Sequence, residues 1–317
     1  NEQILDDGGH FELSPMYHQI MLYRILDCIQ LIKLNKWIDD DLINLLDMSA
    51  SKMLSWLFQV TFKNGDIPIV NDSAIDIAPT TKELFHYGKL LGINKKNIKL
   101  SDSGYRMFKS DKYELFMDMG EVGASYQPGH VHSDTFNFVL YVNNQPFIVD
   151  TGTSTYEKNE RRQLERSTSS HNTVTICDYD QTQIWGGFRV GKRAGIISLT
   201  ESDNKFSSSH DGYKNIGIIH NRKFITNKDS VHIFDKLDKH VTYEKIAYFH
   251  FHPLVNNIII KKTNVFFKSL NIEISFKGKN IFMKKELYKY ACGFNKTENA
   301  FKLKVVFESN LETIIKL

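Results

Sequence analysis

The spacing of apolar residues changes at about residue 100, and this change restricts the folds open to the chain. Before it, apolar residues recur at intervals of three and four, as on one face of a helix. After it, short runs alternate between apolar and polar residues and are separated by polar turns, as in half-buried strands. The 317 residues are enough for about two domains. The sequence therefore predicts an α+β protein, with helices over residues 1–100 and an antiparallel β-sandwich over residues 101–317.

Three helices are expected in the first part. Ser14 suits an N-cap and Pro15 suits the first helical position, so one helix should begin there. A second should begin near residues 39–41, because three aspartates favour the positive N-terminal end of a helix. Thr81–Leu91 forms a shorter third candidate. Residues 65–79 contain two prolines and several turn formers, which predicts a loop.

One hairpin and several further strands are expected in the second part. Thr135–Val142 and Pro146–Val149 flank the polar run Asn143-Asn144-Gln145, which is suited to a hairpin loop. The further strand candidates are Tyr113–Met117, Phe249–His252, Asn257–Ile260, Ile272–Phe276 and Lys302–Phe307.

Composition excludes some classes of function. Forty basic and 37 acidic side chains give a formal charge of +3 without a dense basic block, which argues against nucleic-acid binding. No apolar run is long enough to span a bilayer. The three cysteines are far apart and form neither a disulfide framework nor a zinc-ribbon spacing, so they do not fix the compartment. The sequence does not define the oligomeric state.

The run Gly129–Asp134 carries the strongest chemical signal. In an extended segment, His130, His132 and Asp134 would point to one face. Imidazole can hold a metal or exchange a proton near neutral pH. With Asp150 and His171 downstream, two histidines and a carboxylate would give a zinc-type ligand set with an open position. A histidine-rich strand end without metal, or a cupin-like barrel, is the alternative.

A second motif precedes the first predicted helix. Tyr17 falls in the first turn of that helix, where its phenol could give or take a proton at a sugar oxygen. Its simpler role would be to cover the helix end. His10 and His18 beside it could line a cleft or form hydrogen bonds in the core.

Two further regions offer ligand contacts. Arg162 and Arg166 could bind a carboxylate through paired hydrogen bonds. Tyr156 could stack on a sugar or hydrogen-bond to it.

Together these segments resemble the heparinase II/III-like family of polysaccharide lyases. The similar segments cover residues 6–253 in the family's order and are Asp7–His18, Gly129–Asp134, Val149–Gly152, Arg166–Thr168, His171–Thr173, Trp185–Arg189, Gly191–Ala194 and His210–Tyr213. The resemblance implies that residues 1–100 are the C-terminal part of an (α/α) toroid, followed by the β-sandwich.

The resemblance also implies roles for individual residues. Tyr17 would be the catalytic acid/base and His130 a catalytic histidine. His132, Asp150 and His171 match positions that bind one zinc ion, mainly for structure. Residues expected to contact the substrate are His10, Glu12, His18, Tyr156, Arg162 and Arg166. In the family an asparagine upstream of the tyrosine helix neutralises the substrate carboxylate, so we expect either a fragment of a longer protein or an incomplete active site.

The expected function is β-elimination in an anionic, uronic-acid-containing polysaccharide. A base removes the C5 proton, an acid protonates the departing glycosidic oxygen, and the product carries an unsaturated uronate. Heparan-type, alginate-type and capsular uronides all stay open, and a periplasmic or secreted location is expected. The alternatives are a noncatalytic carbohydrate-binding or surface-polysaccharide assembly protein of the same fold and, less favoured, the cupin-like metal enzyme.

Overall fold

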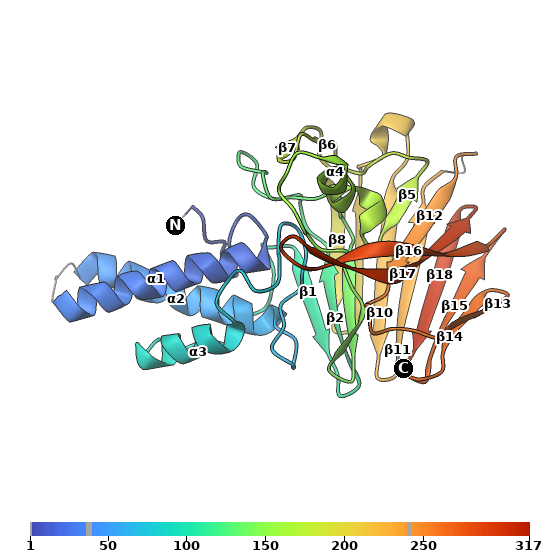
Figure 1. Ribbon diagram of the computed structural model, residues 1–317. Coiled ribbons are helices and arrows are strands. Elements are labelled where there is room, and N and C mark those ends of the chain that lie inside the picture. Colours follow the sequence, from blue (N-terminus) through green and yellow to red (C-terminus); the bar gives the residue numbers. More distant parts are fainter. Residues whose placement is uncertain (1, 36–39, 240–241) are drawn as a thin grey trace.

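The fold combines a helical end with a larger assembly of antiparallel sheets. The computed structural model describes residues 2–35, 40–239 and 242–317. Three helices extend from one side of the sheets: α1 (Pro15–Asn35), α2 (Asp40–Val60) and α3 (Thr81–Leu90) (Figure 1). None of the described helices is long and apolar enough to span a membrane. The α+β class predicted from the sequence is confirmed.

The three predicted helices are present because local signals define their ends. Ser14 Oγ accepts a hydrogen bond from the Tyr17 N–H at 3.4 Å, as expected for an N-cap. Thr80 and Glu83 form a reciprocal capping box at the start of α3. The predicted start at residue 39 lies outside the described residues, and α2 has Asp40 and Asp41 in its first turn. Apolar residues of all three helices form one core, including Leu26, Met53, Leu57 and Leu84.

In the described part of the chain, the strands form four sheets. The sheet nearest the helices has the order β1 (Tyr105–Lys109), β2 (Tyr113–Asp118), β3 (Phe138–Val142) and β4 (Gln145–Ile148). A second has the order β16 (Phe282–Gly293), β17 (Lys296–Phe307), β12 (Lys245–His250) and β5 (Val174–Ile176). The largest has the order β13 (Ile258–Lys261), β14 (Asn264–Phe267), β15 (Ile272–Gly278), β18 (Asn310–Lys316), β11 (Ser230–Leu237), β10 (His220–Asn227), β9 (Lys205–His210) and β8 (Ile196–Ser202). A short hairpin pairs β6 (Ile184–Trp185) with β7 (Arg189–Val190).

One apolar core joins the three larger sheets. Phe138 of β3 packs against Phe224 of β10, with ring centroids 5.8 Å apart. Phe249 of β12 packs against Phe276 of β15 at 5.3 Å. A bridge between Ile148 and Phe251 connects the edge of the first sheet to the chain after β12. The sheets therefore provide a rigid support on which the loops between them are held.

The predicted strands agree with the structure, with shifts at their ends. The hairpin between β3 and β4 turns at Asn143 and Asn144, whose φ angles of 50° and 61° suit asparagine. The predicted segment at 249–252 corresponds to β12, which begins earlier, at Lys245, and ends at His250. The short helix α4 (Glu160–Arg166) had not been predicted.

Gly104, directly before β1, packs closely against Gly120, and Gly92, after α3, is an open glycine that serves as its control. Both have positive φ angles, of 73° and 77°, but a Cβ at Gly104 would lie 2.2 Å from the Gly120 Cα, whereas one at Gly92 would meet no heavy atom within 4 Å. We expect Gly104→Ala to lower the free energy of unfolding by about 1–3 kcal/mol more than Gly92→Ala, because only the first substitution overpacks two backbones. Urea or thermal unfolding of both variants measures the difference, and equal losses would show that this contact relaxes freely.

Candidate active site

Two side chains far apart in sequence meet where the helices join the sheets. Tyr17 lies in the first turn of α1, and His130 lies in the loop between β2 and β3. Their ring centroids are 4.1 Å apart. Tyr17 is half-buried, and the His130 side chain is 22% exposed, so the pair can be reached from solvent. The structure therefore brings together the two residues for which the sequence predicts proton transfer.

Asp72, in the loop after α2, lies at the centre of the polar contacts around this pair. Its side chain is completely buried, with Oδ2 3.0 Å from His130 Nδ1 and Oδ1 2.9 Å from His132 Nε2. The Arg162 guanidinium donates to both carboxylate oxygens. Burial of Asp72 opposes ionisation, but the hydrogen bonds from His130, His132 and Arg162 outweigh it and hold the pKa of this carboxyl far below its usual range.

Asp72 is not among the residues predicted from the sequence, although one signal in the sequence indicates it. The run Asn71-Asp72-Ser73 is a block of polar residues between apolar neighbours, in a loop that precedes the sheets. Asn71 fixes the loop in place, because its Oδ1 accepts from the His132 N–H at 2.9 Å and its Nδ2 donates to the Leu13 carbonyl at 3.0 Å. Such a buried polar run indicates a functional or structural network.

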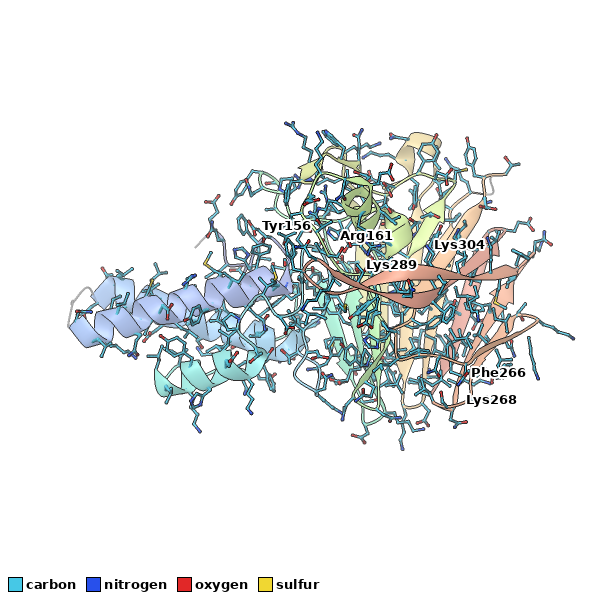
Figure 2. The ribbon with its side chains drawn as sticks, in the orientation of Figure 1. Tyr156, Arg161, Phe266, Lys268, Lys289 and Lys304 are labelled. Atoms are coloured by element: carbon cyan, nitrogen blue, oxygen red, sulfur yellow. The ribbon has the colours of Figure 1, made fainter. Side chains whose placement is uncertain are left out.

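Tyr156 lies beside the pair, near the junction of helices and sheets (Figure 2). Its hydroxyl is 3.2 Å from the Tyr17 hydroxyl and 3.4 Å from the Asp72 carbonyl oxygen. Burial, together with the charge of Asp72, raises the pKa of Tyr156 far above its ordinary value, so this phenol stays protonated. Its single proton can point to the Asp72 carbonyl or to the Tyr17 oxygen.

Glu12 and His10 form the opposite side of the site. Glu12 Oε2 lies 3.7 Å from His130 Nε2 and 4.0 Å from His10 Nδ1. Burial raises the pKa of Glu12. Burial, and then the neighbouring His130, lower the pKa of His10 to about 4. Both ring nitrogens of His10 are buried without a hydrogen-bond partner among the described residues, so a ligand or water could bind there.

The structure holds three of the predicted substrate contacts behind the site instead of at its surface. His18 Nε2 bonds to the Met53 carbonyl at 3.0 Å, and its ring packs on Trp56 at 4.4 Å. Arg162 is fully buried on Asp72 and donates from Nε to the Gly187 carbonyl at 3.0 Å. Arg166 is equally buried and donates to the Val131 carbonyl at 3.0 Å. All three side chains support the loops around the pair and present no free group to a ligand.

The predicted zinc ligands lie next to one another in the buried layer below. The ring centroids of His132 and His171 are 5.3 Å apart, and His171 Nδ1 is 2.7 Å from Asp150 Oδ2. His132 Nδ1 and His171 Nε2 are buried and have no protein partner in the described residues, which suits metal ligands. The oxygens of Asp150 already accept hydrogen bonds from Asn137 and Gly152. In residues 2–35, 40–239 and 242–317, no three His, Cys, Asp or Glu side chains stand arranged as a metal site. Two imidazole nitrogens, His132 Nδ1 and His171 Nε2, are therefore open to a metal ion, whereas the Asp150 oxygens are engaged in protein hydrogen bonds.

Two exposed aromatic side chains lie near residues of the candidate site. Phe188, at the tip of the β6–β7 hairpin, is 41% exposed and lies 6.2 Å from His130 and 5.5 Å from Tyr156, measured between ring centroids. Tyr126 is 57% exposed and lies 5.8 Å from Phe11. Exposed aromatic rings of this kind suit the apolar faces of sugars.

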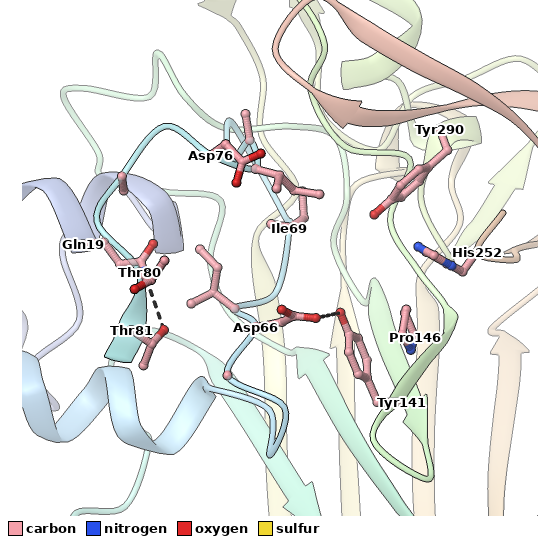
Figure 3. Close-up of a pocket in the computed structure, with 15 residues that line it drawn as sticks. Gln19, Asp66, Ile69, Asp76, Thr80, Thr81, Tyr141, Pro146, His252 and Tyr290 are labelled. Atoms are coloured by element: carbon pink, nitrogen blue, oxygen red, sulfur yellow. Dashed lines mark hydrogen bonds between the residues drawn. The ribbon is translucent and has the colours of Figure 1, made fainter. Parts of the chain in front are cut away.

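A separate pocket lies on another side of the loop that carries Asp72. It has a volume of about 240 Å³, and its walls include Tyr141, Tyr290 and His252 (Figure 3). Of the described residues that line it, Asp66 and Asp76 are acidic and none is lysine or arginine. This charge disfavours an anionic ligand, and neither Tyr17 nor His130 is part of its wall. The Tyr17–His130 pair therefore lies outside this acidic pocket.

Comparison with known families gives two matches that together span almost the whole chain. The model described as heparinase II/III N-terminus matches residues 1–99, and the model described as heparinase II/III-like, C-terminal, matches residues 93–312. A heparin-sulfate lyase of Bacteroides stercoris is 21% identical over 254 residues, covering 71% of this chain and 37% of that protein.

Solved structures show a similar fold. Heparan sulfate lyase HepC from Pedobacter heparinus has a TM-score of 0.76 at 17% identity, over 99% of this chain and 53% of that structure. Another structure, of heparinase III, has a TM-score of 0.75 at 16% identity, over 99% of this chain and 55% of that structure. The chain thus spans about half the length of these proteins.

The buried histidines predict how stability changes with pH. Burial lowers the pKa of His18 to about 3 and that of His10 to about 4, from an ordinary 6.5. The unfolded chain therefore takes up these protons at higher pH than the folded chain, and stability should fall as the pH drops from about 6.5 toward 4, by up to about 1.4 kcal/mol per pH unit and histidine.

Thermal unfolding between pH 7 and pH 4.5 tests this expectation. His18→Gln should lose stability at neutral pH but show a shallower pH dependence than the parent. His232→Gln, at a partly exposed histidine of β11, is the control and should keep the parent's slope. Equal slopes in all three proteins would mean that His18 does not contribute.

Proposed function

Because the chain belongs to the heparinase II/III-like family, we propose that it acts as a polysaccharide lyase. The observation that carries this proposal is the contact between Tyr17 and His130, whose ring centroids are 4.1 Å apart in a solvent-accessible position. A phenol and an imidazole at this separation can serve two proton transfers on one sugar unit.

The proposed reaction is β-elimination next to a uronate. A base takes the C5 proton, the C4–O4 bond breaks as the C4–C5 double bond forms, and an acid gives a proton to O4. Tyr17 and His130 supply these two transfers. The configuration at C5 decides which group is the base, because the C5 hydrogen lies on opposite ring faces in glucuronate and its epimers.

The proposed substrate is an anionic, uronic-acid-containing polysaccharide. The heparin-sulfate lyase of Bacteroides stercoris is named for a substrate of this class. The exposed aromatic rings of Phe188 and Tyr126 suit contacts with the sugars of a polysaccharide. The formal charge of +3 favours a moderately charged uronide over a densely sulfated one.

We further propose that the three helices form the end of an (α/α) toroid and that the sheets form the β-sandwich of this family. Several apolar side chains on α1 and α2 are exposed, among them Leu31 at 50%, Leu34 at 68%, Leu45 at 40% and Met48 at 63%. Such a surface suits packing against further helices.

Substitution of the two residues tests the lyase proposal. Tyr17→Phe and His130→Ala should each lower kcat by about 10²–10⁴-fold, because each removes one proton-transfer group. The assay follows ultraviolet absorbance of the new double bond on several uronides, with the full-length protein.

Tyr23→Phe is the matched control, since Tyr23 is a partly buried phenol on the same helix that packs near Tyr87, away from the pair. It should keep the activity of the parent. Full activity in Tyr17→Phe would remove this residue from the mechanism. Polysaccharide binding without double-bond formation in the parent would favour a noncatalytic carbohydrate-binding or assembly protein.

A structural zinc ion is part of the proposal. His132 Nδ1 and His171 Nε2 would bind it, with Asp150 as the carboxylate nearest to His171. Zinc at this position would tie together the two loops that carry His132 and His171, below His130.

Elemental analysis of the purified protein should find about one zinc per chain. His171→Ala should lower both the zinc content and the melting temperature, whereas His250→Ala should lower stability alone. His250 is a buried histidine that bonds to Asn172 and serves as the control. A fully folded parent without zinc after purification in zinc-containing medium would contradict the metal site.

A further inference from the structure

We propose that Asp72 is a positioning residue that fixes opposite tautomers in the two histidines of the His-x-His motif. In His130 the proton is held on Nδ1, and in His132 it is held on Nε2. The consequence for His130 in catalysis rests on the proposed lyase function, whereas the tautomers themselves do not.

The contacts of Asp72 define which nitrogen carries the proton. An ionised carboxylate only accepts hydrogen bonds, so each imidazole nitrogen within bonding distance must donate. His130 faces Oδ2 with Nδ1 at 3.0 Å, and His132 faces Oδ1 with Nε2 at 2.9 Å. One carboxylate therefore specifies a different tautomer in each ring.

Arg162 keeps this carboxylate ionised and in place. Asp72 and Arg162 are both completely buried, and the guanidinium donates to both oxygens of the carboxylate. Arg162 is itself fixed by the Gly187 carbonyl at 3.0 Å and lies 5.1 Å from the ring centroids of both Tyr156 and Phe188. A buried guanidinium so constrained cannot rotate away, so the orientation of the carboxylate is fixed.

The fixed tautomers leave one free nitrogen on each side of Asp72. In the neutral Nδ1–H tautomer, the free nitrogen of His130 is Nε2, which lies on the side of Glu12, 3.7 Å from its Oε2, where the ring is partly exposed. It can therefore accept a proton from a bound sugar. His132 Nδ1 is buried without a protein partner, on the side of the ring away from Asp72. The same carboxylate thus directs one histidine toward the open site and the other toward the buried layer.

Nitrogen NMR on the native protein tests the proposal directly. In ¹⁵N-histidine-labelled protein, two-bond ¹H–¹⁵N spectra distinguish the two neutral tautomers of each ring. We expect the Nδ1–H form for His130 and the Nε2–H form for His132, with signals assigned by His130→Gln and His132→Gln. The Nε2–H form in His130 of the native protein would overturn the proposal without the need for an Asp72 variant.

Asp72→Asn tests the cause of the tautomers. The amide can donate as well as accept, so the His130 signals should shift toward a mixture of tautomers. In the lyase assay kcat should fall by about 10²–10⁴-fold, while KM should change much less. The groups that bind the substrate are unchanged, but in part of the molecules the proton of His130 moves from Nδ1 to Nε2, the nitrogen that has to accept a proton. Unchanged His130 signals in Asp72→Asn would also overturn the proposal.

Asp235→Asn provides a matched control. Asp235 is a buried carboxylate with the same partners, since His220 Nε2 lies at 2.8 Å and Arg222 donates to both of its oxygens. This variant should lower the melting temperature but leave the His130 and His132 signals as in the parent. If the parent formed no double bond on any uronide, the lyase proposal would fail while the tautomer result would stand, so the two failures can be told apart.

Discussion

The buried ion pair between Asp72 and Arg162 supports the arrangement of the candidate site. Removing two charges from water costs several kcal/mol per ion, and such a pair persists only when all its hydrogen-bonding groups find partners. Here the partners are His130, His132 and the Gly187 carbonyl. The loop after α2, the loop before β3 and the tip of the β6–β7 hairpin are therefore joined at a single point. Loss of either charge would leave the other one buried and uncompensated.

A second buried ion pair of an aspartate and an arginine lies within the sheets. Asp235 and Arg222 are buried together, and Arg222 also donates to the carbonyls of Phe136 and Asn172. Phe136 has a φ angle of 68°, an uncommon value for a bulky residue. This second pair therefore fixes the backbone at Phe136, just before β3, and at Asn172, just before β5. The backbone at Phe136 can then keep a conformation that an isolated segment would not adopt.

The surroundings of the Tyr17–His130 pair and the separate pocket near Asp66 differ in their charged groups. Around Tyr17 and His130 lie aromatic rings, a carboxyl with raised pKa at Glu12 and a neutral imidazole at His10. The pocket between Asp66 and Asp76 instead carries only acidic charge among its described lining residues. The acidic side chains of the pocket would repel an anionic ligand, whereas the surroundings of the Tyr17–His130 pair include the buried cation Arg162 as well as carboxylates. The two regions therefore differ in charge as well as in position.

The sequence by itself predicted the three longer helices, some of the strands and the candidate residues, because caps, turns and apolar spacing act over a few residues. It defined α1 from Ser14 and Pro15, the Asn143–Asn144 turn, and the motifs that carry Tyr17 and His130. It missed α4, which has seven residues, five of them charged, and no apolar spacing to reveal it. Only the tertiary structure decided that Asp72 lies between His130 and Arg162, which are 58 and 90 residues away, and that Arg162 faces inward instead of toward a ligand. No local pattern encodes such a contact, because the free energy that stabilises a buried charge comes from partners that only the folded chain brings together.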